Sequence, residues 1–291
     1  MIIQPTLGID MDFFCYRAAS ASEDEIEYNS DLTLVIGSLS NGQRIIRQQI
    51  KDLRDRFDTD KLVLFFTDIT NFRKDIDPSY KGNRTKRKPA GYARLKRWCM
   101  AEWDSVVLPG LEADDALGIA ATSGKYKNFV IVSPDKDMLQ IPGRIYDLKT
   151  EFTQTATAAE RKLYEQTLTG DSTDGYRGCP GIGPAKCGAI LDTPLPDQSS
   201  PEDRESRGEG RTDSKGRRGK GGRSTGDDGR KAASRRECSG VDYWPRVTAA
   251  YEKAGQSADD ALRNARLAKI LHASDWDSEA QKPILFEPPC A

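Results

Sequence analysis

Short apolar runs alternate with longer amphipathic stretches along most of the chain. The apolar runs lack regular polar alternation, as is typical of strands covered on both faces. The runs that predict strands are Leu7–Ile9, Leu62–Phe66, Val106–Leu108, Phe129–Ser133 and Arg144–Leu148. The stretches with a helical pattern are Phe13–Ser22, Leu32–Phe57, Gly91–Trp103 and Ala113–Thr122. This alternation predicts an α/β fold with a mostly parallel central sheet flanked by helices.

The chain beyond residue 168 has a different pattern. Ser257 and Asp260 form a predicted capping box in front of a helical run. Residues 197–237 contain no Val, Ile, Leu, Met, Phe, Trp or Tyr, but 12 Lys or Arg and 9 Asp or Glu. Such a segment buries too little apolar surface to offset the entropy of ordering it. We expect an α/β domain at 1–168, a helical region at 169–196 and 241–291, and a disordered Gly/Arg/Ser-rich insert at 197–240. The insert is either a basic extension that contacts nucleic acid or a neutral linker.

Composition narrows the chemistry. The 291 residues include 44 Lys or Arg, 45 Asp or Glu, a single His and six Cys without a CxxC pair. One histidine excludes a multi-His metal site and most Ser-His-Asp chemistry, and we interpret His272 as a packing or capping residue. The scattered cysteines argue against a zinc ribbon or a disulfide scaffold and fit a reducing cytoplasm. No apolar window is long enough to span a membrane, and no secretory signal is visible. We expect a cytoplasmic protein, a monomer by default, whose chemistry depends on carboxylates.

Acidic residues follow the ends of four predicted strands. Asp10 follows the first of these strands and Asp68 the second. Glu112, Asp114 and Asp115 follow the third, and Asp135 and Asp137 follow the fourth. In an open parallel sheet these ends meet at one edge, where ligands bind. Each acid alone fits a helix cap or a surface position. Together they would concentrate negative charge that a cation must neutralise, and carboxylates without His or thiolate select Mg²⁺ or Mn²⁺. Asp12 is the least secure candidate, because its period-2 relation to Asp10 directs it elsewhere.

Two further acids, Asp171 and Asp174, directly precede a glycine-rich stretch. In the sequence CPGIGPAK, Gly181 and Gly183 allow a tight turn, and the following proline suits the first turn of a helix. Backbone N–H groups at such a helix start can hold a phosphate. Glycine-rich helix starts are common, so the position behind two acids is what favours a helix–hairpin–helix grip on a DNA backbone.

A basic segment, 72–97, lies between the second predicted strand and the Glu112 cluster. Its ten basic residues against two acids give a net charge of 10 − 2 = +8. The basic residues are Arg73, Lys74, Lys81, Arg84, Lys86, Arg87, Lys88, Arg94, Lys96 and Arg97. Such a run is usually a solvated face, but here it adjoins a predicted acidic metal edge, which by itself would repel a polyanion. We therefore predict DNA contacts from Arg73, Lys74, Lys86, Arg87 and Lys88, with Tyr80 and Tyr92 stacking on bases.

The order IDMD, FFTD, YKGNR, LEADD, SPDKD, GDSTDGYRGCPGIGPAK resembles the 5′-nuclease (flap endonuclease-like) superfamily. The likeness is closest to the 5′→3′ exonucleases of T7-like bacteriophages. It covers Leu7 to Leu191 and resumes weakly over Tyr243–Trp276. The resemblance implies a PIN/5′-nuclease-like sheet, a helical arch over the basic segment and a helix–hairpin–helix in the C-terminal region. The insert is longer and more biased than the resemblance leads us to expect.

The resemblance also implies roles for individual residues. One metal cluster would use Asp10, Asp68, Glu112, Asp114 and Asp115, and a second would use Asp135, Asp137, Asp171 and Asp174. Two Mg²⁺ ions roughly 4 Å apart, for which Mn²⁺ can substitute, would activate water and stabilise the leaving oxygen. Tyr80 and Lys81 match the arch position at the scissile phosphate, and Arg84 matches a phosphate contact. Gly181, Gly183 and Lys186 match the DNA anchor, where K⁺ often binds.

The implied function is a metal-dependent 5′→3′ exodeoxyribonuclease that hydrolyses duplex DNA from its 5′ end. Flap cleavage and RNA-primer removal from RNA–DNA hybrids, in phage replication and host DNA degradation, are further expectations. Two alternatives stay open. A PIN-like ribonuclease shares the strand-end carboxylates but typically lacks the basic arch and the hairpin. A non-catalytic DNA-binding module would usually have lost acids from the LEADD or DKD clusters, and none is lost here.

Overall fold

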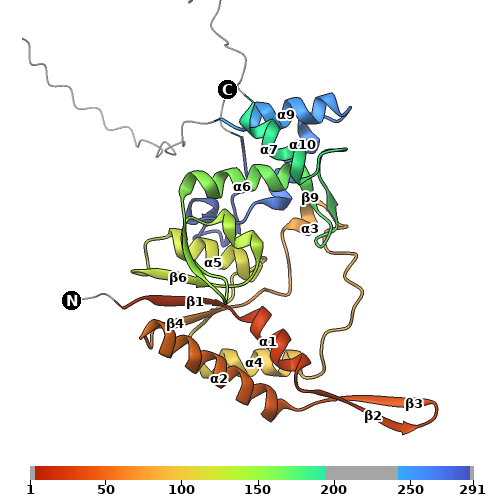
Figure 1. Ribbon diagram of the computed structural model, residues 1–291, viewed down its shortest axis with the longest axis vertical. Helices are drawn as coiled ribbons and strands as arrows, with labels where there is room; N and C mark the ends of the chain where they lie inside the picture. The colour runs from red at the N-terminus through yellow and green to blue at the C-terminus, as the bar shows by residue number, and fades with distance from the viewer. Residues whose placement is uncertain (1–3, 194–241, 289–291) are drawn as a thin grey trace, which may run out of the picture.

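The computed structural model describes residues 4–193 and 242–288, and the insert at 197–240 lies outside them. A six-stranded sheet with the order β5-β4-β1-β6-β7-β8 forms the centre (Figure 1). Its strands are β1 (Thr6–Asp10), β4 (Leu62–Phe65), β5 (Ser105–Val106), β6 (Phe129–Val132), β7 (Gly143–Tyr146) and β8 (Glu151–Gln154). Neighbouring strands are parallel except β7 and β8, which are antiparallel. The predicted α/β fold is confirmed, and β8 is an edge strand that the sequence pattern did not reveal.

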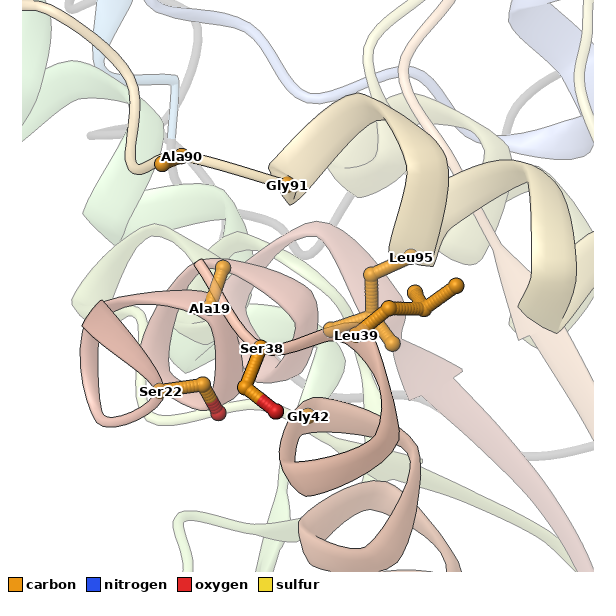
Figure 2. A pocket seen from close by; sticks show the side chains of 8 residues that line it. All are labelled: Ala19, Ser22, Ser38, Leu39, Gly42, Ala90, Gly91 and Leu95. Atoms are coloured by element: carbon orange, nitrogen blue, oxygen red, sulfur yellow. The ribbon is translucent and has the colours of Figure 1, made fainter. Parts of the chain in front are cut away.

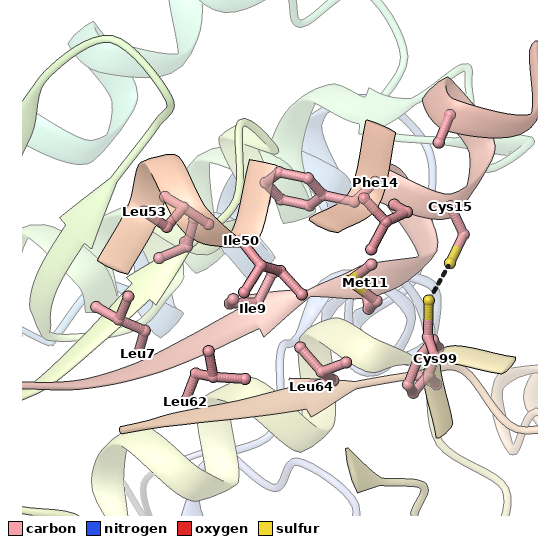
Figure 3. Close-up of a cluster of buried hydrophobic side chains, with 14 of the residues drawn as sticks. Leu7, Ile9, Met11, Phe14, Cys15, Ile50, Leu53, Leu62, Leu64 and Cys99 are labelled. Atoms are coloured by element: carbon pink, nitrogen blue, oxygen red, sulfur yellow. Dashed lines mark hydrogen bonds between the residues drawn. The ribbon is translucent and has the colours of Figure 1, made fainter. Parts of the chain in front are cut away.

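Alternate strand residues point to opposite faces, so the sheet has two cores. Leu7, Ile9, Leu62 and Leu64 pack against α1 (Met11–Ser20), α2 (Leu39–Phe57) and α4 (Tyr92–Glu102) (Figure 3). Val63, Phe65 and Ile131 pack on the other side against α5 (Ala113–Thr122) and the 3₁₀ helix η1 (Lys136–Gln140). Cover on both faces explains why these strands read as continuous apolar runs.

The predicted helix Leu32–Phe57 is wrong over its first six residues. They form β3 (Leu32–Gly37), which pairs with β2 (Glu23–Asn29) in an antiparallel hairpin that projects from the body (Figure 1). Ser38 then caps α2 by accepting a hydrogen bond from the Asn41 N–H. The β-branched residues of LTLVI favour a strand over a helix, a preference that the pattern of apolar positions alone does not show.

The C-terminal region is helical, as expected. Its helices are α7 (Pro184–Asp192), α9 (Trp244–Lys253) and α10 (Ala258–Ala268). They share a core with α6 (Ala156–Thr169), which lies before the expected boundary at residue 169. The short elements β9 (Gly170–Asp171), β10 (Tyr176–Arg177), η2 (Ala273–Asp275), β11 (Trp276–Asp277) and β12 (Lys282–Pro283) complete it. The predicted capping box of Ser257 and Asp260 is confirmed. After α10 the chain returns to the α/β domain, where Ile270 and Leu271 are buried.

The basic segment is helical only at its ends, which corrects the expected helical arch. The four-residue α3 (Arg73–Ile76) lies at its start, α4 begins at Tyr92 near its end, and residues 77–91 form turns and irregular chain. Pro78, Gly82 and Pro89 interrupt a helical backbone there. None of the described helices is both long and apolar enough to cross a membrane.

The part of the basic segment just before α4 packs tightly against the α/β domain. Ala90 and Gly91 lie over the junction of α1, α2 and α4, beside Leu95 and Gly42 (Figure 2). The void between them measures about 10 Å³, which is near the minimum for one water molecule. These residues therefore pack the three helices together and leave no room for a ligand.

Gly118 provides a test of the contact between α5 and the returning chain. A Cβ at Gly118 would lie 2.3 Å from the Leu271 carbonyl oxygen, whereas one at Gly188 in α7 would meet nothing closer than 3.8 Å. We expect Gly118→Ala to lower the free energy of unfolding by about 1–3 kcal/mol because backbone must move. Gly188→Ala should be neutral or stabilising by up to about 1 kcal/mol. Urea denaturation of both variants measures this, and equal effects would contradict the packing described.

Candidate metal and nucleic-acid site

The predicted acids gather at the carboxyl edge of the sheet because β1, β4, β5 and β6 run parallel. Asp10 ends β1, accepts the Ser133 hydroxyl at 3.0 Å from the β6 end, and caps α1 through the Phe13 N–H. Asp68 follows β4 and accepts the Gly110 N–H at 2.8 Å, which ties it to the loop before α5. Both acids thus lie at the carboxyl ends of their strands, which parallel pairing places at the same edge of the sheet.

Asp115 and Arg73 form a buried, bidentate ion pair behind this edge. Two guanidinium nitrogens of Arg73 reach the two Asp115 oxygens at 2.6 and 2.8 Å. The same oxygens also accept the N–H groups of Leu271 and Glu112. Both side chains are at most 1% exposed. Two predictions are thereby corrected: Asp115 has no free lone pair for a metal, and Arg73 cannot reach DNA.

Tyr80, Lys81 and Arg84 connect the basic segment to the acids. The Tyr80 hydroxyl lies 2.9 Å from a Glu112 oxygen and 2.8 Å from an Asp174 oxygen. The Lys81 ammonium pairs with Glu112 and lies 3.5 Å from Asp174, while Arg84 donates to Asp174 at 2.6 Å. Tyr80 is only 2% exposed, so the expectation that it stacks on a base is wrong. Its position beside the site is as predicted.

Asp135, Asp137 and Asp171 of the second predicted set lie at or beside η1, whereas Asp174 contacts Tyr80, Lys81 and Arg84. Asp135 caps η1 by accepting the Asp137 N–H at 2.9 Å, and Lys136 bridges to Asp171 at 2.9 Å. Asp137 also accepts a hydrogen bond from Gln166 in α6 at 2.7 Å. The structure thus brings η1 and the β9 region together and adds Gln166, which the sequence did not single out.

The carboxylates differ in how their charge is balanced. Burial would raise the pKa of Glu112, but the Lys81 and Arg73 cations lower it to about 2. Burial and the neighbouring acids Asp115 and Glu112 raise the pKa of Asp114 well above its ordinary value. Burial raises the pKa of Asp10 to about 6, with Asp12 adding to it, and burial with Asp135 does the same for Asp137. The edge therefore holds excess negative charge that an added cation would relieve.

The donor chemistry fits a hard divalent cation, because the ligands are carboxylates and no thiolate or imidazole joins them. Among residues 4–193 and 242–288, no three acidic, His or Cys side chains already form a ready metal-binding group. Lys81 gives the physical reason on one side of the site. Its ammonium neutralises Glu112 and Asp174. Burial alone would lower the pKa of Lys81, but these two acids and Asp114 outweigh that effect and raise it.

The predicted DNA-contacting residues lie on the exposed side of the basic segment. Lys74, Lys86, Arg87 and Lys88 are exposed, although Arg87 pairs with Glu23 at the base of the β2–β3 hairpin. An open pocket of about 310 Å³ brings Lys86 and Arg87 together with Tyr16 of α1, which is 46% exposed. The sequence analysis did not single out Tyr16, because nothing in a helical stretch marks which aromatic ring is exposed. Tyr92, predicted to stack on bases, is instead buried and donates to Asp12.

The glycine-rich turn leads into α7 as its sequence predicted. Gly181 has φ +74°, Gly183 is the residue before the helix, and Pro184 occupies the first turn. Lys186 is exposed and its ammonium donates to the Gly181 carbonyl at 3.0 Å. Residues 183–186 are exposed, and the start of a helix suits an anion.

Two minor predictions are settled by the same contacts. Asp12 accepts the Thr67 N–H and pairs with Lys96, so it supports the fold beside the acidic edge. His272 caps η2 together with Asp275, as the capping interpretation predicted.

Known proteins resemble this chain over most of its length. The family model described as the 5′-3′ exonuclease N-terminal resolvase-like domain matches residues 6–167. The exodeoxyribonuclease of Enterobacteria phage T3 is 27% identical over 97% of this chain and 92% of its own length. The exonuclease of Escherichia phage T7 is 28% identical over 97% and 93%. The crystal structure of the T5 D15 protein co-crystallised with metal ions has a similar fold, with TM-score 0.52 and 14% identity over 91% of this chain and 89% of that one.

Arg73→Met tests whether the buried ion pair supports the fold. It leaves Asp115 charged and buried, so we expect a loss of about 3–5 kcal/mol in the free energy of unfolding. The double variant Arg73→Met/Asp115→Leu should recover about half of that loss, because it removes the buried charge but not the orphaned backbone groups. Arg84→Met is the matched control: its ion pair is half-exposed, at 52% for the Arg84 side chain, so it should cost less than about 1 kcal/mol. Urea denaturation compares the three, and a double variant no more stable than Arg73→Met would contradict this account.

Proposed function

Because this chain belongs to the 5′-3′ exonuclease family, we propose that it is a divalent-metal-dependent 5′→3′ exodeoxyribonuclease acting on duplex DNA. Removal of 5′ flaps and of RNA primers from RNA–DNA hybrids, in phage replication and host DNA degradation, belongs to the same proposal. The observation that carries it is the meeting of opposite charges: a carboxylate edge contacts Lys81 and Arg84 of the basic segment. Phosphodiester hydrolysis needs both, cations to hold the strand and acids to hold metal ions.

The metal ligands that we propose are the predicted acids of the edge other than Asp115, whose oxygens are all taken by Arg73 and backbone N–H groups. One group is Asp10, Asp68, Glu112 and Asp114, and the other is Asp135, Asp137, Asp171 and Asp174. Divalent ions bound there, Mg²⁺ with Mn²⁺ as a substitute, would supply an activated water and stabilise charge on the leaving oxygen. The T5 D15 structure obtained with metal ions supports this choice through its similar fold.

The residues of the basic segment would act on the phosphate. Lys81 and Arg84 reach the acids with side chains long enough to turn toward a bound strand, where they would stabilise negative charge in the transition state. Tyr80 would hold Glu112 and Asp174 in place through its hydroxyl, because it is buried between them. No general-base histidine is required.

The DNA path that we propose runs from this site along the basic segment on one side and along the glycine-rich turn before α7 on the other. Lys74, Lys86, Arg87 and Lys88 would hold the backbone of the strand, and Tyr16 offers an exposed ring beside Lys86. On the other side, the turn with Gly181, Gly183 and Lys186 would anchor duplex phosphates in the manner of a helix–hairpin–helix, with K⁺ as a further ligand. These contacts are largely electrostatic, so binding should weaken steeply with salt.

End-labelled DNA tests the proposed activity. Duplex labelled at the 5′ end or the 3′ end is incubated with Mg²⁺ or with EDTA. We expect early release of the 5′ label with Mg²⁺ only, and absence of DNA cleavage under every condition would reject the proposal. Cleavage of RNA alone would favour a PIN-like ribonuclease, and binding without cleavage would favour a DNA-binding module.

Asp114→Asn and Asp135→Asn should abolish turnover while DNA binding, measured by fluorescence anisotropy, is retained.

Lys81→Ala separates phosphate chemistry from metal binding. We expect the single-turnover rate at saturating metal and DNA to fall about 100-fold or more, because one transition-state charge contact is lost. Mn²⁺ binding, followed by calorimetry, should be retained or strengthened, since the ammonium no longer neutralises Glu112 and Asp174. Lys127→Ala is the control, an exposed lysine before the amino end of β6, at the opposite edge of the sheet from the acids. An unchanged Lys81→Ala rate would remove Lys81 from the mechanism.

A further inference from the structure

A row of buried amides runs from the C-terminal segment 267–271 to Asp137. The Ile270 N–H donates to Gln140 Oε1 at 3.1 Å, and Gln140 Nε2 donates to the Ala268 carbonyl at 2.7 Å. Gln140 Nε2 also donates to Gln166 Oε1. Gln166 Nε2 in turn donates to Asp137 Oδ1 at 2.7 Å. Gln140 and Gln166 are 2% and 5% exposed, so water does not compete for these bonds.

The direction of this row is dictated by the backbone. A backbone N–H can only donate, so the Gln140 atom that faces Ile270 must be its amide oxygen. The Gln140 amide nitrogen then faces Gln166 and requires an acceptor there, which commits the Gln166 oxygen. Only the Gln166 N–H₂ group is left for Asp137. A donor is therefore presented to Asp137 whatever the charge of that carboxylate, and a flip of either amide would place like groups together.

We propose that Gln166 is a positioning residue for metal binding: held by Gln140 and the segment 267–271, it fixes the Asp137 carboxylate so that Oδ2 is presented to a divalent cation. This inference rests on the proposed function and names a residue that the carboxylate pattern does not contain. Asp137 is half-buried and adjoins Asp135 through its own N–H. Without the Gln166 bond its carboxylate would turn freely in the field of Asp135, Asp171 and Asp174, which raise its pKa together with burial. A donor that hydrogen-bonds a metal-binding carboxylate typically changes metal affinity 10–100-fold.

Mn²⁺ binding to the full-length protein tests the inference. Calorimetric titrations without DNA are compared for the wild type, Gln166→Leu and Gln166→Asn, whose shorter side chain keeps an amide but cannot reach Asp137. We expect both variants to bind Mn²⁺ 10–100-fold more weakly at one site. Their single-turnover rates should be low at limiting Mn²⁺ and return to within about threefold of the wild type at saturation. A merely structural defect would lower the rate at saturation as well.

Gln154→Leu is the matched control. Gln154 is half-buried and donates to the Leu139 carbonyl of the same η1 helix at 2.6 Å, so its loss removes a bond to η1 without touching a carboxylate. Its Mn²⁺ affinity should equal that of the wild type. Wild-type affinity in both Gln166 variants, or equal weakening in Gln154→Leu, would overturn the positioning role. A wild-type protein that binds no Mn²⁺ would instead reject the proposed function itself.

Discussion

The buried ion pair between Arg73 and Asp115 is the interaction on which the site depends. Arg73 also donates to the carbonyls of Leu267 and Lys269, at 2.9 and 2.6 Å. One side chain thereby joins the basic segment, the start of α5 and the segment after α10. An isolated buried charge would be very costly. Arg73 therefore requires Asp115 and the two carbonyl groups, and Asp115 requires Arg73. Since Glu112 and Asp114 stand beside Asp115 at the start of α5, their placement follows from this pair.

The acids of the edge are stabilised in two different ways. Glu112, Asp171 and Asp174 are paired with Lys81, Lys136 or Arg84, so they are balanced within the protein. Asp10, Asp114 and Asp137 carry pKa values raised by burial and by one another. Such residues weaken the fold in exchange for a site that attracts cations, because raised acid pKa values oppose ionisation at neutral pH. Functional sites are where this cost is tolerated.

The sheet and its acidic edge could be predicted from sequence because each rests on a local signal. Uninterrupted apolar runs marked β1, β4 and β6, and the acid directly behind each run needed only the rule that parallel strands end together. The pairing of Asp115 with Arg73 could not be predicted, because a buried bidentate pair and a metal ligand show the same residue types. The β2–β3 hairpin was missed for another reason: its apolar residues are exposed, with Ile26 44% and Ile36 47% accessible, so they do not report a core. Gln166 carries no charge, and only its hydrogen-bond partners support the role that we propose for it.

The C-terminal region is joined to the acidic edge through the chain that follows α10. Arg246 donates to the carbonyls of Thr193 and Asp242, so one side chain links the end of α7 to the start of α9. The segment 267–271 must reach Arg73 and Gln140, and through them it supports the acids on both sides of the edge. The C-terminal region therefore supports the acidic edge, because this segment donates the Leu271 N–H to Asp115 and fixes Gln140 through Ile270 and Ala268.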